Sequence, residues 1–174
     1  LKESNDPVLT QKGISQAQAA GRHLADIDFD AFYSSGLLRA ARTASEIMNC
    51  QAEKKELNVL PLLAEVGVSP EYSGADMQEI IDFCPTARLA QGVDATQPIV
   101  CYSSQKNEKD LFDRAENVIE YFREKYKNGE KVVAVSHAAF ITFIVFHIMG
   151  FGSPMPAFDI SFYNTGITRI IFYK

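Results

Sequence analysis

The chain has 174 residues, of which 47% are hydrophobic and 22% are charged, a balance typical of one globular domain with a sizeable core. Its formal net charge of −5 argues against a general nucleic-acid-binding protein, because such proteins more often carry a basic face. No run reaches the roughly 18 uncharged apolar residues of a membrane span. The three cysteines are widely spaced and form no Cys-x-x-Cys pair, which predicts reduced thiols and a cytoplasmic protein.

Predicted helices and strands alternate along the sequence. Apolar residues recur at helical spacing in residues 11–26, 37–49, 108–127 and 138–149. Short apolar runs predict strands at residues 30–34, 57–60, 131–135 and 167–173. This alternation predicts an α/β fold with helices on both faces of the sheet, and in such sheets ligands bind at the carboxyl ends of the strands.

Residues 62–107 are less regular and contain scattered Gly and Pro, with one short helix predicted at residues 76–83. An insertion of this length is often functional, as a lid or a substrate wall. A divergent surface segment would have the same composition, so both interpretations stay open.

Two predicted strands end in polar residues directly before a helix. The first is FYSSGLLRAARTA, which contains Arg39, and the second is AVSHAAF, which contains His137. A helix N-terminus suits an anion because its N–H groups are free and its dipole is positive. Arg is also the residue that binds phosphate or carboxylate in a bidentate way. Taken singly, each residue is more often structural; together they are candidate anion ligands.

The two other histidines are expected to be structural. His23 lies within the first predicted helix and should be exposed, and His147 lies on the apolar helix, on a different face from His137. No residues show the spacing of metal ligands, so the sequence predicts no metal site.

Four motifs follow one another in a distinctive order. They are L-T-x-x-G (Leu9–Gly13), S-S-x-L-x-R-A-x-x-T-A (Ser34–Ala44), L-x-E (Leu63–Glu65) and V-S-H-A (Val135–Ala138). In this order and spacing the chain closely resembles the histidine phosphatase superfamily, also called phosphoglycerate mutase-like. The resemblance covers most of the chain, and the second motif is its most specific part.

The resemblance implies a single three-layer α/β/α domain over residues 1–174, built around a mainly parallel sheet, and chemistry through a phosphohistidine. In the family one His attacks phosphorus, a second His and two Arg hold the phosphoryl oxygens, and an acid protonates the leaving alcohol. By matching motifs, Arg39 is a phosphate-binding Arg, His137 is the second His, protonated or donating a hydrogen bond, and Glu65 is the proton donor. The backbone N–H of Ala138, where many members have Gly, stays available to the phosphoryl group. No metal or other cofactor is expected, because side chains supply the positive charge.

Two departures from the family pattern affect the site. The family's first strand ends in Arg-His-Gly, which carries the nucleophile, and this tripeptide is absent here. We expect it on a strand and turn of roughly 10 to 15 residues upstream of Leu1. Around the acid, the sequence AEVGVSPEYSGAD lacks the family's Gly-rich pattern, so Glu71 and Asp76 compete with Glu65 as proton donors.

The expected function is a histidine acid phosphatase-type enzyme that hydrolyses a small phosphate monoester and releases inorganic phosphate, with neither nucleic acid nor a membrane as partner. Residues 66–107, where the family pattern fades, are expected to form the substrate region. A phosphoglycerate mutase is the nearest alternative, and a non-catalytic phospho-ligand-binding protein is another if no Arg-His-Gly precedes Leu1. A serine hydrolase using Ser34 or Ser35 with His137 is disfavoured, because the G-x-S-x-G nucleophile elbow is missing.

Overall fold

The computed structural model describes residues 6–67, 76–99 and 107–173. In chain order, its elements in these ranges are α1 (Gln11–His23), β1 (Ala31–Ser34), α2 (Leu38–Met48), β2 (Leu57–Val59), the 3-10 helix η1 (Pro61–Leu63), α3 (Met77–Phe83), β3 (Ala87–Leu89), α4 (Glu108–Lys125), β4 (Val132–Val135) and α5 (Ala138–Ile148). All the predicted helices, and the predicted strands that correspond to β1, β2 and β4, are confirmed with small differences at their ends.

Within the described residues, four strands form one parallel sheet in the order β3-β2-β1-β4. β1 lies between β2 and β4, with Ser34 opposite Val59 on one side and Val135 on the other. Parallel strands in register end at the same edge of the sheet. The residues that follow β1, β2 and β4 are therefore brought to one edge.

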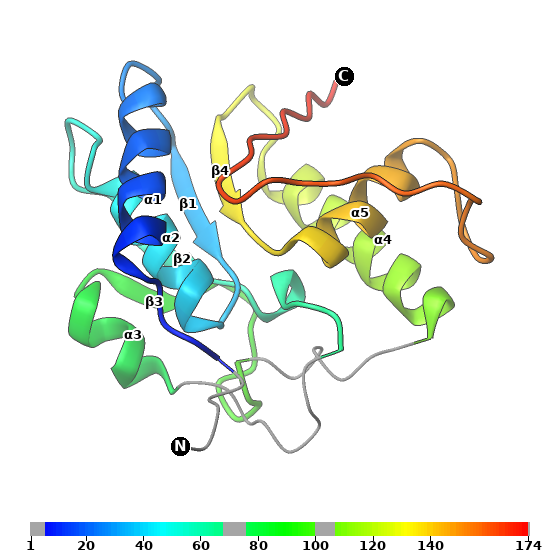
Figure 1. The fold of residues 1–174 in the computed structure, drawn as a ribbon, viewed down its shortest axis with the longest axis horizontal. Helices are drawn as coiled ribbons and strands as arrows, with labels where there is room; N and C mark the ends of the chain where they lie inside the picture. Colours follow the sequence, from blue (N-terminus) through cyan, green and yellow to red (C-terminus); the bar gives the residue numbers. More distant parts are fainter. Residues whose placement is uncertain (1–5, 68–75, 100–106, 174) are drawn as a thin grey trace.

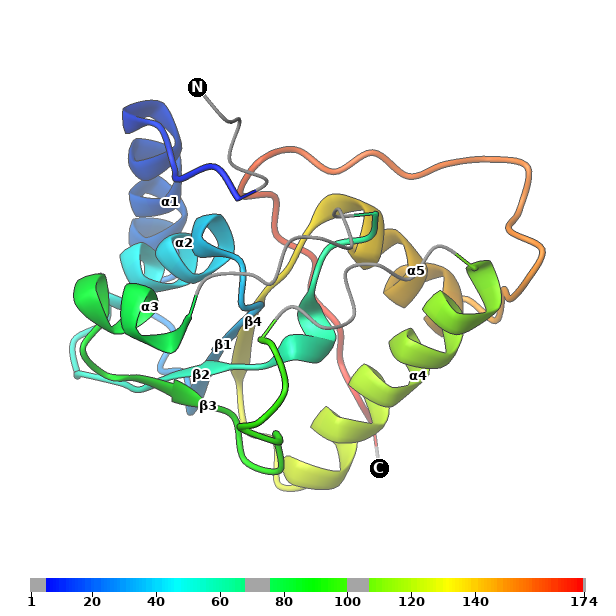
Figure 2. The ribbon, with the colours of Figure 1, turned by 90° about the horizontal axis from the view of Figure 1, so that it is seen from below.

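Helices cover both faces of the sheet (Figures 1 and 2). α1, α2 and α3 pack on one face, where Phe32 joins a core with apolar residues of α2 and β2. α4, α5 and η1 pack on the other face, where Tyr33 joins Phe140 and Ala115 in a second core. Adjacent strand residues point to opposite faces, so β1 contributes to both cores. The expected three-layer α/β/α arrangement is confirmed.

Side-chain caps explain where three of the helices begin. The hydroxyl of Thr10 accepts a hydrogen bond from the Gly13 N–H at 3.2 Å and so caps α1. Asp76 and Glu79 form a reciprocal capping box at the start of α3, with bonds of 2.9 and 3.0 Å. The Asn107 side chain caps α4 by accepting a hydrogen bond from the Lys109 N–H at 2.9 Å, without a reciprocal partner in the described residues.

The strand predicted at residues 167–173 is wrong. These residues contain no helix or strand, and the side chains of Ile167 and Ile171 are 55% and 51% exposed. An apolar run becomes a strand only when a neighbouring backbone supplies hydrogen bonds, and the described residues provide no pairing for this one. β3 was not predicted, because three residues centred on the exposed Arg88 carry no clear period.

Candidate functional site

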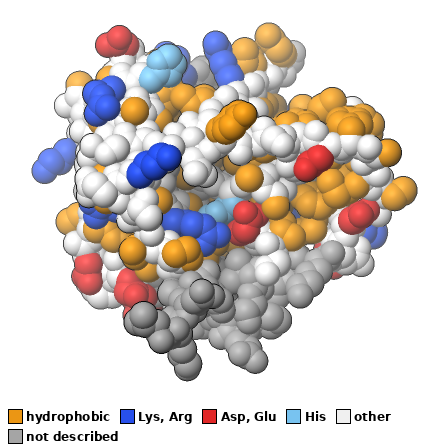
Figure 3. Space-filling model, in the orientation of Figure 1, with side chains coloured by type: hydrophobic (Ala, Val, Ile, Leu, Met, Phe, Trp, Pro, Cys, Tyr) orange, Lys and Arg blue, Asp and Glu red, His pale blue; other side chains and the backbone are white. Residues whose placement is uncertain are grey.

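The predicted site residues meet at the carboxyl edge of the sheet. Ser35 follows β1 directly, and its N–H donates to the Val135 carbonyl at 3.0 Å. Ser136 and His137 follow β4, and the Ser136 hydroxyl donates to the Leu63 carbonyl at 2.8 Å. These bonds hold the segments after β1 and β4 and the end of η1 together. Figure 3 shows a histidine beside basic and acidic side chains near the centre of one face.

His137 is buried and neutral. Its side chain is 7% exposed and occupies the N-cap position of α5. Burial, and then the positive charges of Arg39 and Arg114, lower the pKa of the imidazole from 6.5 to about 3. Near neutral pH the ring therefore acts as a hydrogen-bonding group and not as a cation. Of the two expected states, protonated or donating, the lowered pKa favours the second.

Arg39 lies in the first turn of α2, as predicted, but it is already engaged by a carboxylate. Its Nη1 donates to Asp6 Oδ1 at 3.2 Å, and the Leu38 N–H donates to Asp6 Oδ2 at 2.6 Å. Asp6 is almost fully buried, whereas the Arg39 side chain is 27% exposed. The Asp6 carboxylate therefore caps α2 and orients the guanidinium, part of which stays exposed.

Asp6 was not predicted as part of the site. Asn5-Asp6-Pro7 has the composition of a turn. Asp6 caps a helix that lies 32 residues further along the chain. A local sequence signature such as a capping box does not exist for such a distant cap.

Glu65 lies beside the start of α5. Its Oε1 accepts hydrogen bonds from the Val66 N–H at 2.8 Å and from the Phe140 N–H at 3.2 Å. Phe140 is the third residue of α5, so the carboxylate satisfies a backbone donor of the first helical turn. His137 is the N-cap residue of the same helix, so the predicted acid and the predicted second His lie at one end of α5.

The two competing acids differ from Glu65. The Asp76 carboxylate accepts the Glu79 N–H at 2.9 Å and is used as the cap of α3. Glu71 lies outside the described residues. Of the two acids that the structure describes, Glu65 is the one at the carboxyl edge of β1 and β4.

Ala138 occupies the first position of α5 and is exposed. In the described part of the chain, its N–H and that of Ala139 have no hydrogen-bond acceptor, whereas the Phe140 N–H is taken by Glu65. Free N–H groups at a helix start are suited to an anion. The two N–H groups therefore lack an acceptor among the described residues, and phosphate binding by Ala138 stays a prediction.

Arg114 is a second cation near His137 that was not predicted. It is 2% exposed, and its guanidinium lies 3.7 Å from the centroid of the Phe140 ring. It is one of the two charges that lower the pKa of His137. A helical projection could have revealed it, because Arg114 lies three residues after Leu111 and four before Val118, both on the buried face of α4.

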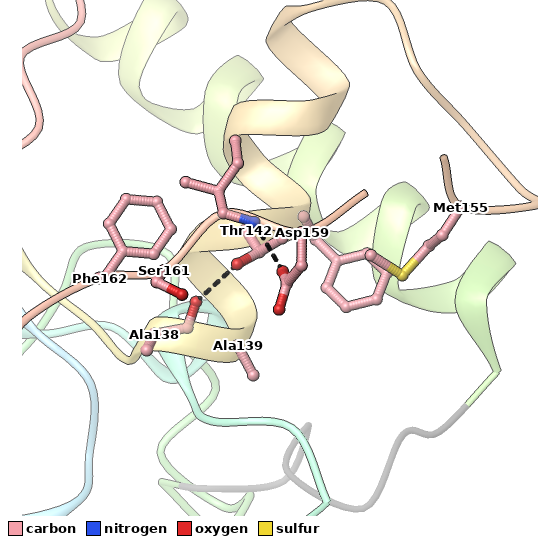
Figure 4. A pocket seen from close by; sticks show the side chains of 9 residues that line it. Ala138, Ala139, Thr142, Met155, Asp159, Ser161 and Phe162 are labelled. Atoms are coloured by element: carbon pink, nitrogen blue, oxygen red, sulfur yellow. Dashed lines mark hydrogen bonds between the residues drawn. The ribbon is translucent and has the colours of Figure 1, made fainter. Parts of the chain in front are cut away.

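A pocket of about 390 Å³ adjoins the start of α5 (Figure 4). It lies between the first turns of α5 and residues 155–162 of the C-terminal segment, and Figure 4 shows the two segments facing each other. The residues that line it are Ala138, Ala139, Thr142, Phe143, Met155, Asp159, Ile160, Ser161 and Phe162. Ala138 is shared with the predicted phosphate site, but Arg39, Glu65 and His137 do not line the pocket.

The remaining histidines lie away from this edge. His23 is exposed at the end of α1, as predicted, and His147 is half-buried in the last turn of α5. Among the described residues, no three His, Cys, Asp or Glu side chains are grouped closely enough to hold a metal ion. No helix in the described ranges has the length and apolar character needed to cross a membrane.

Comparisons with known proteins agree on one family. The sequence model of the histidine phosphatase superfamily (branch 1) matches residues 1–174. A 2,3-bisphosphoglycerate-dependent phosphoglycerate mutase of Bartonella henselae is 38% identical over 79 residues, which is 43% of this chain and 37% of the relative. Fructose-2,6-bisphosphatase TIGAR of Xenopus laevis is 32% identical over 89 residues, which is 50% of this chain and 31% of the relative. The matches thus span about a third of the length of these relatives.

Solved structures show the same fold. The ecdysone phosphate phosphatase of Bombix mori superposes with a TM-score of 0.58 at 17% identity, over 95% of this chain and 66% of that one. A phosphoglycerate mutase of Bacillus anthracis superposes with a TM-score of 0.60 at 22% identity, over 83% of this chain and 70% of that one. At this level of identity the likeness establishes the fold alone, and the reaction has to be inferred from the residues of the site.

Proposed function

Because the chain belongs to the histidine phosphatase superfamily (branch 1), we propose that the complete protein is a phosphatase that hydrolyses small phosphate monoesters through a phosphohistidine intermediate. The observation that carries this proposal is the meeting of Arg39, Glu65 and His137 at one edge of the sheet. Few other reactions need a cation, a neutral imidazole, a carboxylic acid and a helix N-terminus around one small volume.

Each group has a defined task in the proposed reaction. Arg39, the ring N–H of His137 and the N–H of Ala138 hold the phosphoryl oxygens and stabilise their charge in the transition state. A nucleophilic His forms a bond to phosphorus while the ester P–O bond breaks, and Glu65 gives its proton to the departing alkoxide. The Glu65 carboxylate then takes a proton from the water that attacks phosphorus, and the P–N bond breaks to release inorganic phosphate.

We place the nucleophile on a strand that precedes Leu1 and pairs with β4. In the described residues β4 is an edge strand, and Val132, Val133 and Val135 are only partly buried. A strand added there in parallel would end beside His137, because parallel strands end at the same edge. An Arg-His-Gly sequence at its end would bring the second Arg and the nucleophile to the phosphoryl group. Together with residues 1–174, such a strand would complete a single domain.

The organic part of the substrate is proposed to lie next to the start of α5. The pocket of about 390 Å³ shares Ala138 with the phosphate site and is lined by apolar side chains together with Asp159 and Ser161. Residues 66–107 remain the second proposed substrate region, and about two thirds of this region is described. Among the described cysteines, Cys50 and Cys84 are free thiols, which supports the proposed cytoplasmic location.

Phosphate release by the full-length protein tests the proposal. A panel of sugar phosphates, phosphoamino acids, phosphorylated cofactors and nucleotides should reveal at least one efficiently hydrolysed monoester. His137→Ala should abolish most of this turnover, whereas His23→Ala, which removes an exposed imidazole, should retain it. Isomerisation of a phosphoglycerate that depends on added 2,3-bisphosphoglycerate and exceeds hydrolysis would favour a mutase. Binding of phosphate esters without turnover would favour the non-catalytic alternative.

A further inference from the structure

Ser35 and His137 form a buried hydrogen-bonded pair across the β1–β4 edge. The Ser35 Oγ lies 2.7 Å from His137 Nε2, and Ser35 is fully buried. The same Oγ accepts a hydrogen bond from the Leu37 N–H at 3.3 Å. Ser35 is the second Ser of the motif after β1, and the proposed reaction gives it no role.

The proton of the Ser35 hydroxyl has one available acceptor. A serine hydroxyl donates one hydrogen bond and accepts up to two. The Leu37 N–H is a donor, so it cannot take the proton, and among the described residues His137 Nε2 is the other atom within hydrogen-bond distance. Ser35 therefore donates to Nε2, and this nitrogen carries a lone pair. A neutral imidazole then carries its proton on Nδ1.

We propose that Ser35 is a positioning residue that fixes His137 as the Nδ1–H tautomer, so that Nδ1 is the atom that donates to a phosphoryl oxygen. The second half of this statement rests on the proposed phosphatase function, whereas the tautomer belongs to the ligand-free protein. A ring with the opposite tautomer would direct a proton at Ser35 and leave the hydroxyl proton buried without an acceptor, which is energetically unfavourable.

Two further observations agree with this assignment. Nδ1 has no hydrogen-bond partner in the described part of the chain, and His137 keeps a small exposed fraction of 7%. The positive charges of Arg39 and Arg114 and the burial of the ring also oppose protonation of both nitrogens. A neutral ring with one N–H that lacks an acceptor in the protein is the state that can donate to an anion without a second proton.

Ser34 provides a matched control. It precedes Ser35 in the chain and is also fully buried, but its Oγ has no hydrogen-bond partner among the described residues. Ser34→Ala therefore removes a hydroxyl of the same size from the same strand end without touching the His137 ring. Ser35→Thr keeps a hydroxyl at the critical position and serves as the conservative variant.

Long-range proton–nitrogen correlation spectra of the full-length, histidine-labelled protein at neutral pH test the proposal without substrate. The parent protein and Ser34→Ala should show the Nδ1–H pattern for His137. Ser35→Ala should lose this pattern or mix it with Nε2–H, and Ser35→Thr should restore it. An Nε2–H pattern in the parent, or an unchanged Nδ1–H pattern in Ser35→Ala, would overturn the assignment.

Inorganic phosphate binding tests the second half of the proposal. Ser35→Ala should weaken binding about tenfold, which is the loss of one oriented hydrogen bond, and Ser34→Ala should bind as the parent does. Equal affinity in the parent and Ser35→Ala would refute the role of Nδ1 as donor. If Ser35→Ala fails to fold, the spectrum of the parent still decides the tautomer. A full-length protein with the predicted tautomer but no phosphatase activity would refute the proposed function alone.

Discussion

The buried neutral His137 should make the protein lose stability in mild acid. The folded ring has a pKa of about 3, and the ordinary value of 6.5 applies to the unfolded chain. Below about pH 6.5 the unfolded chain therefore binds more protons at this residue than the folded protein does, so the free energy of unfolding falls as the pH falls towards 3. Between about pH 6 and about pH 4 this loss amounts to about 2–3 kcal/mol, because each pH unit is worth about 1.4 kcal/mol per proton.

Urea unfolding at a series of pH values measures this loss. Weakly binding buffer anions are needed, since a bound phosphate would favour the protonated ring. Between about pH 6 and about pH 4, the free energy of unfolding of His137→Gln should fall by about 2–3 kcal/mol less than that of the parent protein. His23→Gln should lose as much free energy of unfolding on acidification as the parent protein does, because it leaves the buried His137 ring in place. An equal fall in the free energy of unfolding for the parent and His137→Gln would show that the fold does not hold His137 neutral.

Three substitutions test other parts of the account. Arg39→Ala should weaken the binding of inorganic phosphate by about 1.5–3 kcal/mol, the value of a charge-assisted hydrogen bond, as measured by competitive inhibition. Glu65→Gln should lower kcat by about 10²–10⁴-fold on alkyl phosphates and much less on p-nitrophenyl phosphate, whose leaving group needs little protonation. Gly36→Ala should lower the free energy of unfolding by about 1–3 kcal/mol, because a Cβ at this position would collide with the backbone carbonyl of Ile99.

Controls and contradicting outcomes differ among these substitutions. Arg42→Ala removes a cation of α2 that is paired with Glu46 and should leave phosphate binding unchanged. An equal effect of Arg39→Ala and Arg42→Ala would mean that general charge, and not the site, binds the anion. Equal losses of Glu65→Gln on both substrate classes would contradict its role as proton donor. An unchanged denaturation midpoint for Gly36→Ala would contradict the close approach of Ile99.

The sequence predicted the frame of the site because that frame depends on local patterns. The apolar periods of α2 and α5 and the short apolar runs of β1 and β4 determine where each element ends. Arg39 and His137 follow directly from these ends. Two parallel strands in register then bring their ends together without further information.

The contacts that complete the site depend on tertiary structure. Glu65 reaches α5 across a sequence separation of 75 residues, and Asp6 reaches Arg39 across 33 residues. Side chains at such distances meet only after the whole sheet has formed, so no local period predicts them. Arg114 is a charged residue on a buried helical face; binary patterning counts it as an exception, and only a helical projection of α4 places it among the buried residues.

The most direct test of the central claim is the site of phosphorylation in the full-length protein during turnover. Rapid quenching with a hydrolysed monoester, followed by peptide mass spectrometry under conditions that preserve phosphohistidine, identifies the residue that carries the phosphoryl group. We expect an acid-labile phosphohistidine in an Arg-His-Gly sequence upstream of Leu1, with reduced accumulation in Arg39→Ala. A phosphoryl group on Ser35, or turnover with no phosphohistidine at any time, would contradict it.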